Sequence, residues 1–267
     1  MKVYKILPLI ALILFSCEKD LDFEYHEIEP LTVVEGTLTD AGATVSITQT
    51  TPMDEPFSSS HITDATVELV DLSGGDTWQL SPGENGLFSA PVCPTVGHEY
   101  ELRVSNGRDY YSARSTMLSP TQILSLEFNW IDMLGKDVAA LQVVLKDNRR
   151  NDHEMYWIRA YRNGMGYSWN LVGKRLNISD TLTEVIMTTQ RDPDDKDDKN
   201  NLFDGDIVKV TVTPICEEMF DYLFALLYTG SNGQRMYEGD FCLGYFLASP
   251  VATAEIVYHP DEIARYK

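Results

Sequence analysis

The sequence predicts a mainly β protein, in which an immunoglobulin-like β-sandwich is followed by a second β-rich domain that carries one main α-helix. Three observations lead to this prediction. Short runs of alternating apolar and polar residues recur along the chain, as expected of half-buried strands. Turn residues such as Asn-Gly and Gly-Gly separate these runs. One segment near residue 217 changes instead to the apolar spacing of a helix.

Residues 1–17 are predicted to be a lipoprotein signal peptide and lipobox. Lys2 and Lys5 form a short positive start before an apolar run over residues 6–15, which is followed by Ser16-Cys17. This run is shorter than the roughly 20 residues that span a bilayer, and its length is typical of a signal-peptide core. We expect Cys17 to be acylated and to become the mature N-terminus, held by a lipid anchor in the outer membrane.

Residues 18–30 are predicted to form an acidic tether, because they are rich in Asp and Glu and are closed by Pro30. An acidic stretch directly after the cysteine resembles the signal that sends Bacteroidota lipoproteins to the outer face of the outer membrane. We therefore expect the protein to face the cell exterior. The alternative is that these are ordinary solvated charges.

Residues 31–118 are predicted to form the immunoglobulin-like sandwich. Asn106-Gly107 predicts a hairpin in which both turn residues adopt positive φ. Short strands at this spacing are typical of such a sandwich. The expected strands cover residues 31–38, 43–50, 65–72, 77–80, 86–90, 98–105 and 110–116.

Residues 119–267 are predicted to form the second domain, which follows a boundary at Leu118-Ser119-Pro120 and contains a helix at residues 217–228. Pro214 precedes this helix, acidic residues occupy its first turn and Gly230 ends it. Apolar residues at 219, 220, 223, 226 and 227 predict one buried stripe. The expected strands cover residues 123–130, 138–146, 155–161, 166–175, 182–188, 207–213, 241–248 and 252–258.

The composition argues against a nucleic-acid partner. The formal net charge of −20 becomes −22 once residues 1–16, which carry Lys2 and Lys5 and no acidic residue, are removed. Nucleic-acid binding requires clustered Lys and Arg instead. No glycine-rich phosphate loop, His-Glu-x-x-His motif or Gly-x-Ser-x-Gly motif is present in the sequence. We expect no cofactor and no enzymatic activity.

Several segments, in this order and behind the lipobox, resemble a Bacteroidota lipoprotein family, the domain of unknown function 4249. They are LTVVEG at residues 31–36, ITDATVEL at 62–69, GHEYELRV at 97–104, FDGD at 203–206 and GYF at 244–246. The chain departs from the family at residues 236–240, where an Asn-rich segment is usual. The resemblance implies an outer-membrane lipoprotein that accompanies a TonB-dependent β-barrel transporter, and it supplies no catalytic residues.

The aromatic residues Trp157, Tyr161, Tyr167 and Trp169 are the best candidates for binding a ligand or a partner protein. They flank Asn163-Gly164, which predicts a hairpin. Aromatic side chains on one side of that hairpin could stack on a sugar or pack against a protein. The alternative, which we favour, is that they form sheet core, because aromatic residues are enriched in strands whatever their function.

Two further sites are weaker candidates. Asp192, Asp194, Asp195 and Asp197 offer oxygen ligands for calcium, but Lys196 and Asp197 break the register of an EF-hand loop, so a solvated acidic loop is the preferred interpretation. Cys216 and Cys242 could form a disulfide in an exported protein. Free thiols are the alternative.

The predicted function is a non-enzymatic accessory for ligand capture or transport, working with a TonB-dependent β-barrel transporter. Two alternatives remain at this point. One is a cell-surface hydrolase that acts on glycan or peptide, because acidic residues are too abundant to exclude a catalytic pair. The other is a structural or adhesive surface protein.

Overall fold

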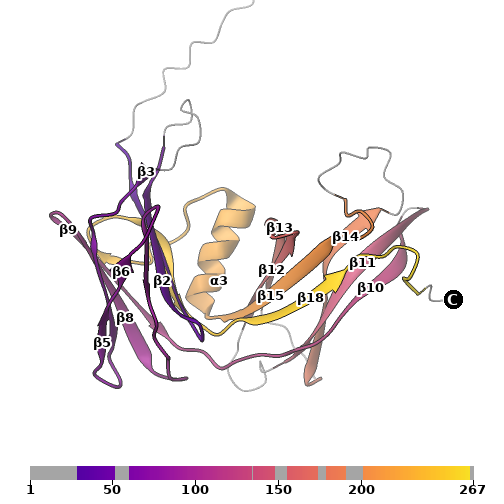
Figure 1. Cartoon of the computed structure of the whole chain (residues 1–267), viewed down its shortest axis with the longest axis horizontal. Helices are drawn as coiled ribbons and strands as arrows, with labels where there is room; N and C mark the ends of the chain where they lie inside the picture. The colour runs from indigo at the N-terminus through magenta and orange to yellow at the C-terminus, as the bar shows by residue number, and fades with distance from the viewer. Residues whose placement is uncertain are drawn as a thin grey trace, which may run out of the picture.

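The structure is a computed structural model, which describes residues 29–51, 60–133, 135–147, 155–173, 179–190 and 201–264. Regular structure in these residues is almost all β-strand, together with one α-helix, α3 (Glu217–Phe224). The predicted fold class is confirmed. Figure 1 shows the strands gathered into two groups, with α3 between them.

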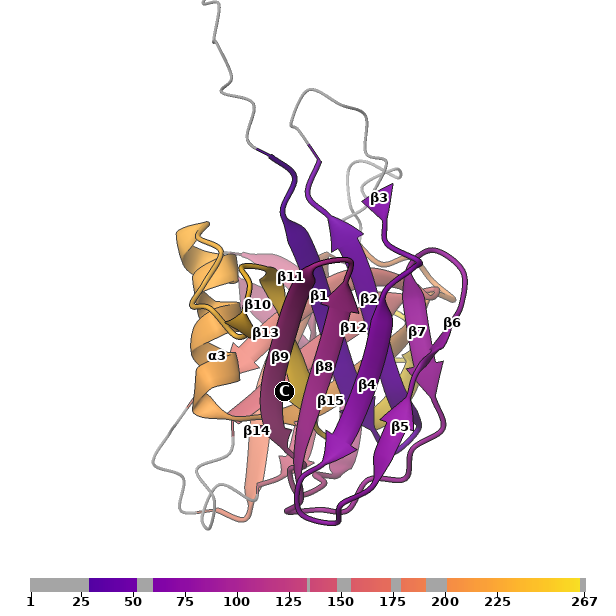
Figure 2. The same cartoon turned by 90° about the vertical axis from the view of Figure 1, so that its left-hand side faces the viewer.

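The first sandwich is built from two sheets. Its strands are β1 (Thr32–Thr39), β2 (Gly42–Gln49), β3 (Ser60–His61), β4 (Thr66–Asp71), β5 (Thr77–Gln79), β6 (Ser81–Pro82), β7 (Leu87–Ala90), β8 (Glu99–Asn106), β9 (Asp109–Thr116), β16 (Glu238–Gly239) and β17 (Leu243–Ala248). One sheet has the order β17-β1-β2-β7-β6, with β3 paired to β2, and the other has the order β16-β9-β8-β4-β5 (Figure 2). Buried side chains of both sheets, such as Ile47 and Leu102, form the first core.

The first sandwich includes strands from the C-terminal third of the chain. β17 pairs with β1 in parallel, from Val33 opposite Leu243 to Leu38 opposite Ala248, and β16 pairs with β9. The predicted division at residues 118 and 119 therefore placed these strands in the other domain. Alternation locates a strand at residues 241–248, but it carries no information on which strand will be the neighbour.

The second sandwich also has two sheets. Its strands are β10 (Ile123–Met133), β11 (Lys136–Lys146), β12 (Met155–Arg162), β13 (Met165–Val172), β14 (Thr181–Gln190), β15 (Ile207–Ile215) and β18 (Ala252–Val257). One sheet has the order β10-β11-β14, and the other has the order β13-β12-β15-β18. Side chains such as Leu141, Ile158 and Val210 form the second core. We call the β13-β12-β15-β18 sheet the β12 sheet, and its side away from the second core the outer face.

The predicted helix is present, but its C-terminal part is π-helical rather than α-helical. α3 is followed by a π-helical segment, Ala225–Thr229, and Gly230 ends it in the left-handed conformation with φ 63°. Met219, Tyr222 and Leu223 are buried, whereas Leu226 is 37% exposed. The i→i+5 bonding of the π-helical segment moves its side chains off the α-helical stripe, which explains why Leu226 does not continue the buried face.

A third core joins the two sandwiches. It contains Met155 and Trp157 of β12, Tyr222 and Leu223 of α3, and Tyr245 of β17. α3 thus packs its buried face where both sandwiches contribute side chains (Figure 1). We call this cluster the inter-sandwich core.

Ser249 links the two sandwiches through hydrogen bonds and is 1% exposed. Its backbone N–H donates to the carbonyl of Leu38 at 2.9 Å. Its hydroxyl donates to the carbonyl of Pro214 in β15 at 2.8 Å. The chain is therefore fastened to both sandwiches at the point where it passes from β17 to β18.

The two predicted hairpins form with different turns. Asn163 and Gly164 both have positive φ, 49° and 85°, as expected for this pair. At the other hairpin only Gly107 has positive φ, 63°, because Asn106 is still paired with Asp109. The expectation that Asn106 also adopts positive φ was wrong.

Candidate functional site

The outer face of the β12 sheet carries Trp157, Arg159 and Tyr161. Successive side chains of a strand point to opposite faces, and the alternate residues of β12 lie in the second core. On the neighbouring strands, Trp169 of β13 lies opposite Arg159, and Thr211 of β15 lies opposite Arg159 on the other side. An arginine is thus flanked by aromatic and hydroxyl side chains on one surface.

The structure divides the four predicted aromatic residues between core and surface. Trp157 is 7% exposed and belongs to the inter-sandwich core, and Tyr167 packs against the second core. Tyr161 is half-buried. Trp169 is 39% exposed, and its ring centroid lies 5.8 Å from that of Trp157. Trp157 and Trp169 are therefore brought together, with Trp169 as the accessible member.

The first sandwich supplies Tyr245 to this surface. Its ring meets Trp157 edge-on at 6.2 Å between centroids and Tyr222 of α3 at 5.8 Å. Burial raises the pKa of Tyr245, the negative charge of Glu35 raises it further, and the positive charge of Arg159 opposes this rise. Glu35 lies opposite Tyr245 in the sheet, so charged groups from both sandwiches act on one tyrosine.

Arg159 differs from the paired arginines of the described chain. Its guanidinium carbon lies 4.2 Å from the centroid of the Trp157 ring, a cation–π arrangement. Arg103 and Arg114 both pair with Glu101. Within the described residues, the structure gives Arg159 no carboxylate within ion-pair distance, so its charge is available to a ligand.

A second exposed feature lies on the helix. Phe220, Phe224 and Tyr228 follow one another at intervals of four residues, with ring centroids 6.0 Å and 4.7 Å apart. Phe224 is 45% exposed and Tyr228 is 65% exposed. We call these three residues the aromatic row. The apolar spacing of the sequence did not predict this row, because the predicted stripe does not include residues 224 and 228.

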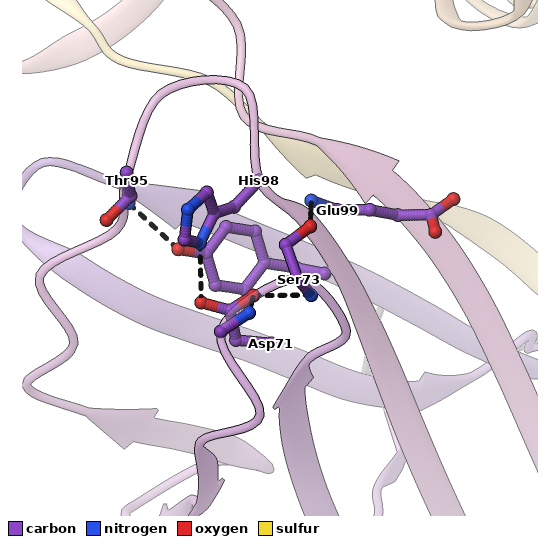
Figure 3. Close-up of polar contacts among 7 residues, drawn as sticks. Asp71, Ser73, Thr95, His98 and Glu99 are labelled. Atoms are coloured by element: carbon purple, nitrogen blue, oxygen red, sulfur yellow. Dashed lines mark hydrogen bonds and ion pairs between the residues drawn. The ribbon is translucent and has the colours of Figure 1, made fainter.

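The first sandwich contains an aspartate–histidine pair, in which Asp71 is buried and His98 is partly exposed (Figure 3). The Nδ1 atom of His98 lies 2.8 Å from the Oδ2 atom of Asp71, and the backbone N–H groups of Ser73 and Gly74 donate to Oδ1 at 2.9 Å and 2.7 Å. Burial would raise the pKa of Asp71, but the hydrogen bonds from His98, Gly74 and Ser73 outweigh it and hold the pKa below the ordinary value.

This pair resembles part of a catalytic triad, in which a carboxylate orients an imidazole. A nucleophile is the missing component. Ser73 Oγ accepts a hydrogen bond from the N–H of Glu99, and Tyr100 Oη accepts one from the N–H of Thr95 (Figure 3). Among the described residues, no side-chain hydroxyl is hydrogen-bonded to the His98 ring. The pair fixes the turn after β4. The Asp-x-Ser-Gly pattern at residues 71–74 favours such a turn, but His98 lies too far along the chain to be linked to it by sequence.

Comparison with known protein families assigns the chain to one of them. The family model "Domain of unknown function (DUF4249)" matches residues 18–253. The chain belongs to this family. Among curated proteins no match is found. A two-fibronectin-type-III-domain segment from chicken tenascin is similar at 13% sequence identity and a TM-score of 0.23, over 70% of this chain and 91% of that chain.

The candidate disulfide between Cys216 and Cys242 of this DUF4249 chain is not formed in the structure. Cys216 and Cys242 are free thiols in the structure, because Cys216 packs against the inter-sandwich core and Cys242 lies in the first core. Burial is the main cause that raises the pKa of Cys216 to about 11 and that of Cys242 to about 12. Both thiols are therefore protonated and unreactive near neutral pH. Cys93 is exposed.

Several predicted features lie outside the described residues. These are the predicted lipidation site Cys17, the predicted tether up to residue 28, and the candidate calcium ligands Asp192, Asp194, Asp195 and Asp197. Within the described part of this DUF4249 chain, no group of three or more His, Cys, Asp or Glu side chains could hold a metal ion. None of the helical segments described there combines the length and apolar character of a membrane span.

Proposed function

We propose that this protein is a surface-exposed outer-membrane lipoprotein, anchored through Cys17, that captures a ligand for a TonB-dependent β-barrel transporter and has no enzymatic activity. The outer face of the β12 sheet is the capture surface. The observation that carries the proposal is the grouping of Trp157, Trp169 and Tyr245 around the unpaired charge of Arg159.

Aromatic and arginine side chains provide most of the binding energy at recognition surfaces. Trp169 offers an accessible ring, and Trp157 and Tyr245 form a rigid base beneath it because they belong to the inter-sandwich core. Two sandwiches and a helix thus hold the binding groups in place before the ligand arrives. Such preorganisation reduces the entropy lost on binding.

The aromatic row is the proposed contact with the transporter. Phe224 and Tyr228 expose apolar surface, while Glu217, Glu218 and Asp221 supply only negative charge on the same helix. A complementary partner surface would be apolar with basic residues at its edge, because opposite charges favour the correct encounter. The helix lies between the sandwiches, next to the capture surface (Figure 1).

The experiment is a pull-down from detergent-solubilised outer membranes with the lipidated protein as bait, read by mass spectrometry. We expect a TonB-dependent β-barrel to co-purify, and Phe224→Ser combined with Tyr228→Ser to reduce its yield. Leu87→Ser is the matched control, because Leu87 is 44% exposed and lies on β7, away from the aromatic row. Equal yields from the control and the aromatic-row variant would contradict the docking surface.

Anchoring is tested separately. Cys17→Ala should abolish incorporation of a fatty-acid probe, since the acyl chain would be attached to that sulfur. Equal labelling of the wild type and the variant would contradict the lipoprotein assignment. Protease treatment of intact cells then tests the exterior location, because only a surface-exposed protein is degraded.

The hydrolase alternative has one specific observation in its favour, the hydrogen bond between Asp71 and His98. Purified protein that lacks residues 1–17 should turn over neither glycan nor peptide, because no side-chain hydroxyl of the described residues is hydrogen-bonded to the His98 ring. Hydrolysis that is abolished by His98→Ala would overturn the proposal.

A further inference from the structure

Four polar atoms on the outer face of the β12 sheet are buried without a hydrogen-bond partner in the described structure. They are Trp157 Nε1, Arg159 Nε, Thr211 Oγ1 and Thr213 Oγ1. Thr211 lies directly opposite Arg159, and Thr213 lies opposite Trp157. Directly opposed residues have Cβ atoms about 4.5–5.5 Å apart, so the four residues that carry these atoms are neighbours on one face of the sheet.

Such a cluster is unusual, because buried polar groups are nearly always satisfied. Trp157, Thr211 and Thr213 are 7%, 7% and 3% exposed, so water does not reach them freely. The protein contains 41 acidic residues against 21 Lys and Arg, yet none of the described carboxylates pairs with Arg159. The missing partner is therefore a group that is not supplied by the described part of the chain.

The donor set defines what that group must be. An indole N–H and a guanidinium N–H can only donate, and a threonine hydroxyl can donate as well. The partner must therefore accept several hydrogen bonds. Arg159 provides one uncompensated positive charge, which matches one negative charge. The guanidinium fork fits the two oxygens of a planar carboxylate.

The surroundings define the rest of the ligand. Trp169 lies opposite Arg159 and is 39% exposed, whereas Trp157 and Thr211 are buried. A ligand therefore reaches Arg159 from the side of Trp169, and its remaining atoms lie against that ring. A phosphate dianion would need a second free cation. The next basic residue along β15, Lys209, is opposite Glu255.

We infer that the outer face of the β12 sheet binds the carboxylate of a small ligand with an apolar or aromatic body, through Arg159, the Trp157 indole N–H and the Thr211 hydroxyl. This inference rests on the proposed capture function and names its ligand class. Glu35 of the first sandwich is a negatively charged neighbour of this site, since it acts on the same tyrosine, Tyr245, as Arg159 does. Its negative charge would weaken the binding of a carboxylate. Burial raises the pKa of the Glu35 carboxyl, which favours its neutral form.

The test uses ¹⁵N-labelled protein that lacks residues 1–17, with benzoate as the probe, and benzamide and phenyl phosphate as comparisons. The indole N–H resonance of Trp157 is assigned from its absence in Trp157→Phe. We expect benzoate to shift this resonance in a saturable way. We expect benzamide, which has the same shape without the charge, to bind roughly tenfold more weakly or worse, since hydrogen bonds to charged groups are the stronger ones.

Variants separate recognition from folding. Arg159→Gln should weaken benzoate binding roughly tenfold or more, while the circular dichroism spectrum stays unchanged. Arg159→Lys keeps the charge but not the fork and should be intermediate. Thr211→Val, which removes one hydroxyl, should lower the affinity for benzoate a few-fold. Arg108→Gln is the control, because it removes the same charge from the exposed turn after β8. Its affinity should equal that of the wild type.

Three results would overturn the inference. The first is no shift of the Trp157 resonance with benzoate at concentrations that saturate a millimolar site. The second is equal binding of benzamide or tighter binding of phenyl phosphate. The third is an equal loss of affinity in Arg108→Gln. None of these results affects the transporter pull-down, which tests the proposed accessory function independently. Failure of the carboxylate site and failure of the accessory function are therefore distinguishable.

Discussion

The hydroxyl of Ser249 donates a hydrogen bond to the carbonyl of Pro214 at 2.8 Å, and both atoms are buried. Since the backbone N–H of Ser249 is bonded to Leu38, one residue connects the first sandwich to β15 of the second. The orientation of the two sandwiches at the candidate site therefore depends on this residue as well as on the inter-sandwich core.

Ser249→Ala should lower the free energy of unfolding by about 1 kcal/mol or somewhat more, because the carbonyl of Pro214 would lose its buried donor. Urea denaturation of the protein lacking residues 1–17 measures this change. Ser89→Ala, at an exposed position of β7, should have almost no effect. Equal midpoints for wild type and Ser249→Ala would show that the hydrogen bond contributes nothing to stability.

The two tryptophans of the candidate site should behave differently when truncated. Trp157→Ala removes a core side chain and should cost roughly 3–5 kcal/mol of stability. Trp169→Ala should cost far less, because 39% of the residue is exposed, but it should weaken ligand capture. Thermal unfolding and binding, measured on the same samples, separate the two effects. A large loss of stability in Trp169→Ala would contradict its assignment to the surface.

Asp71→Asn should lower the free energy of unfolding by about 1–3 kcal/mol at neutral pH, because it removes a buried, hydrogen-bonded charge. The pKa of Asp71 lies below its ordinary value of 3.8 in the native state, so the unfolded chain takes up a proton at higher pH than the native protein. This stabilisation is therefore complete above the unfolded pKa and is lost as the pH falls through the native pKa.

Urea titrations between about pH 7 and pH 2 measure that dependence. The difference between wild type and Asp71→Asn should be constant from neutral pH to about pH 5 and should shrink below the ordinary pKa of aspartate. Asp76→Asn, at an exposed position of the same turn, is the control and should leave the profile unchanged. A difference that grows on acidification would have the wrong sign for this explanation.

Thiol counting tests the separation of Cys216 and Cys242. Protein that lacks residues 1–17 and is denatured without reductant should react with Ellman's reagent at Cys93, Cys216 and Cys242. In the native protein the exposed Cys93 should react first, because burial keeps the other two thiols protonated. Reaction of Cys93 alone after denaturation would show that the other two form a disulfide.

Local features of the sequence were sufficient to predict most strands and the helix. Alternation in residues 207–213 corresponds to β15, and Gly230 ends the helix as expected. The membership of the first sandwich was not predictable in this way, because pairing of Val33 with Leu243 depends on contacts distant in sequence. The π-helical segment after Phe224 was likewise not visible in the apolar spacing.

The candidate site could be predicted only in part. Alternation along β12 places Trp157, Arg159 and Tyr161 on one face, and the structure agrees. The role of Tyr245 depends on how the two sandwiches meet, and no local pattern contains that information. The lack of an ion-pair partner for Arg159 among the described residues was also not predictable, because a sequence with 41 acidic residues offers many apparent partners.

The parallel pairing of β1 with β17 has a consequence for the order in which the protein can be assembled. A chain that emerges from its N-terminus completes β1 long before its neighbour exists, because Val33 must wait for Leu243. Until then β1 is an open edge, and such an edge invites pairing with other chains. A nascent chain halted before β17 would thus be prone to aggregate, and the N-terminal strands would not be a transplantable domain. The first strand of this sandwich is therefore fully paired only after its last strand, β17, has been made.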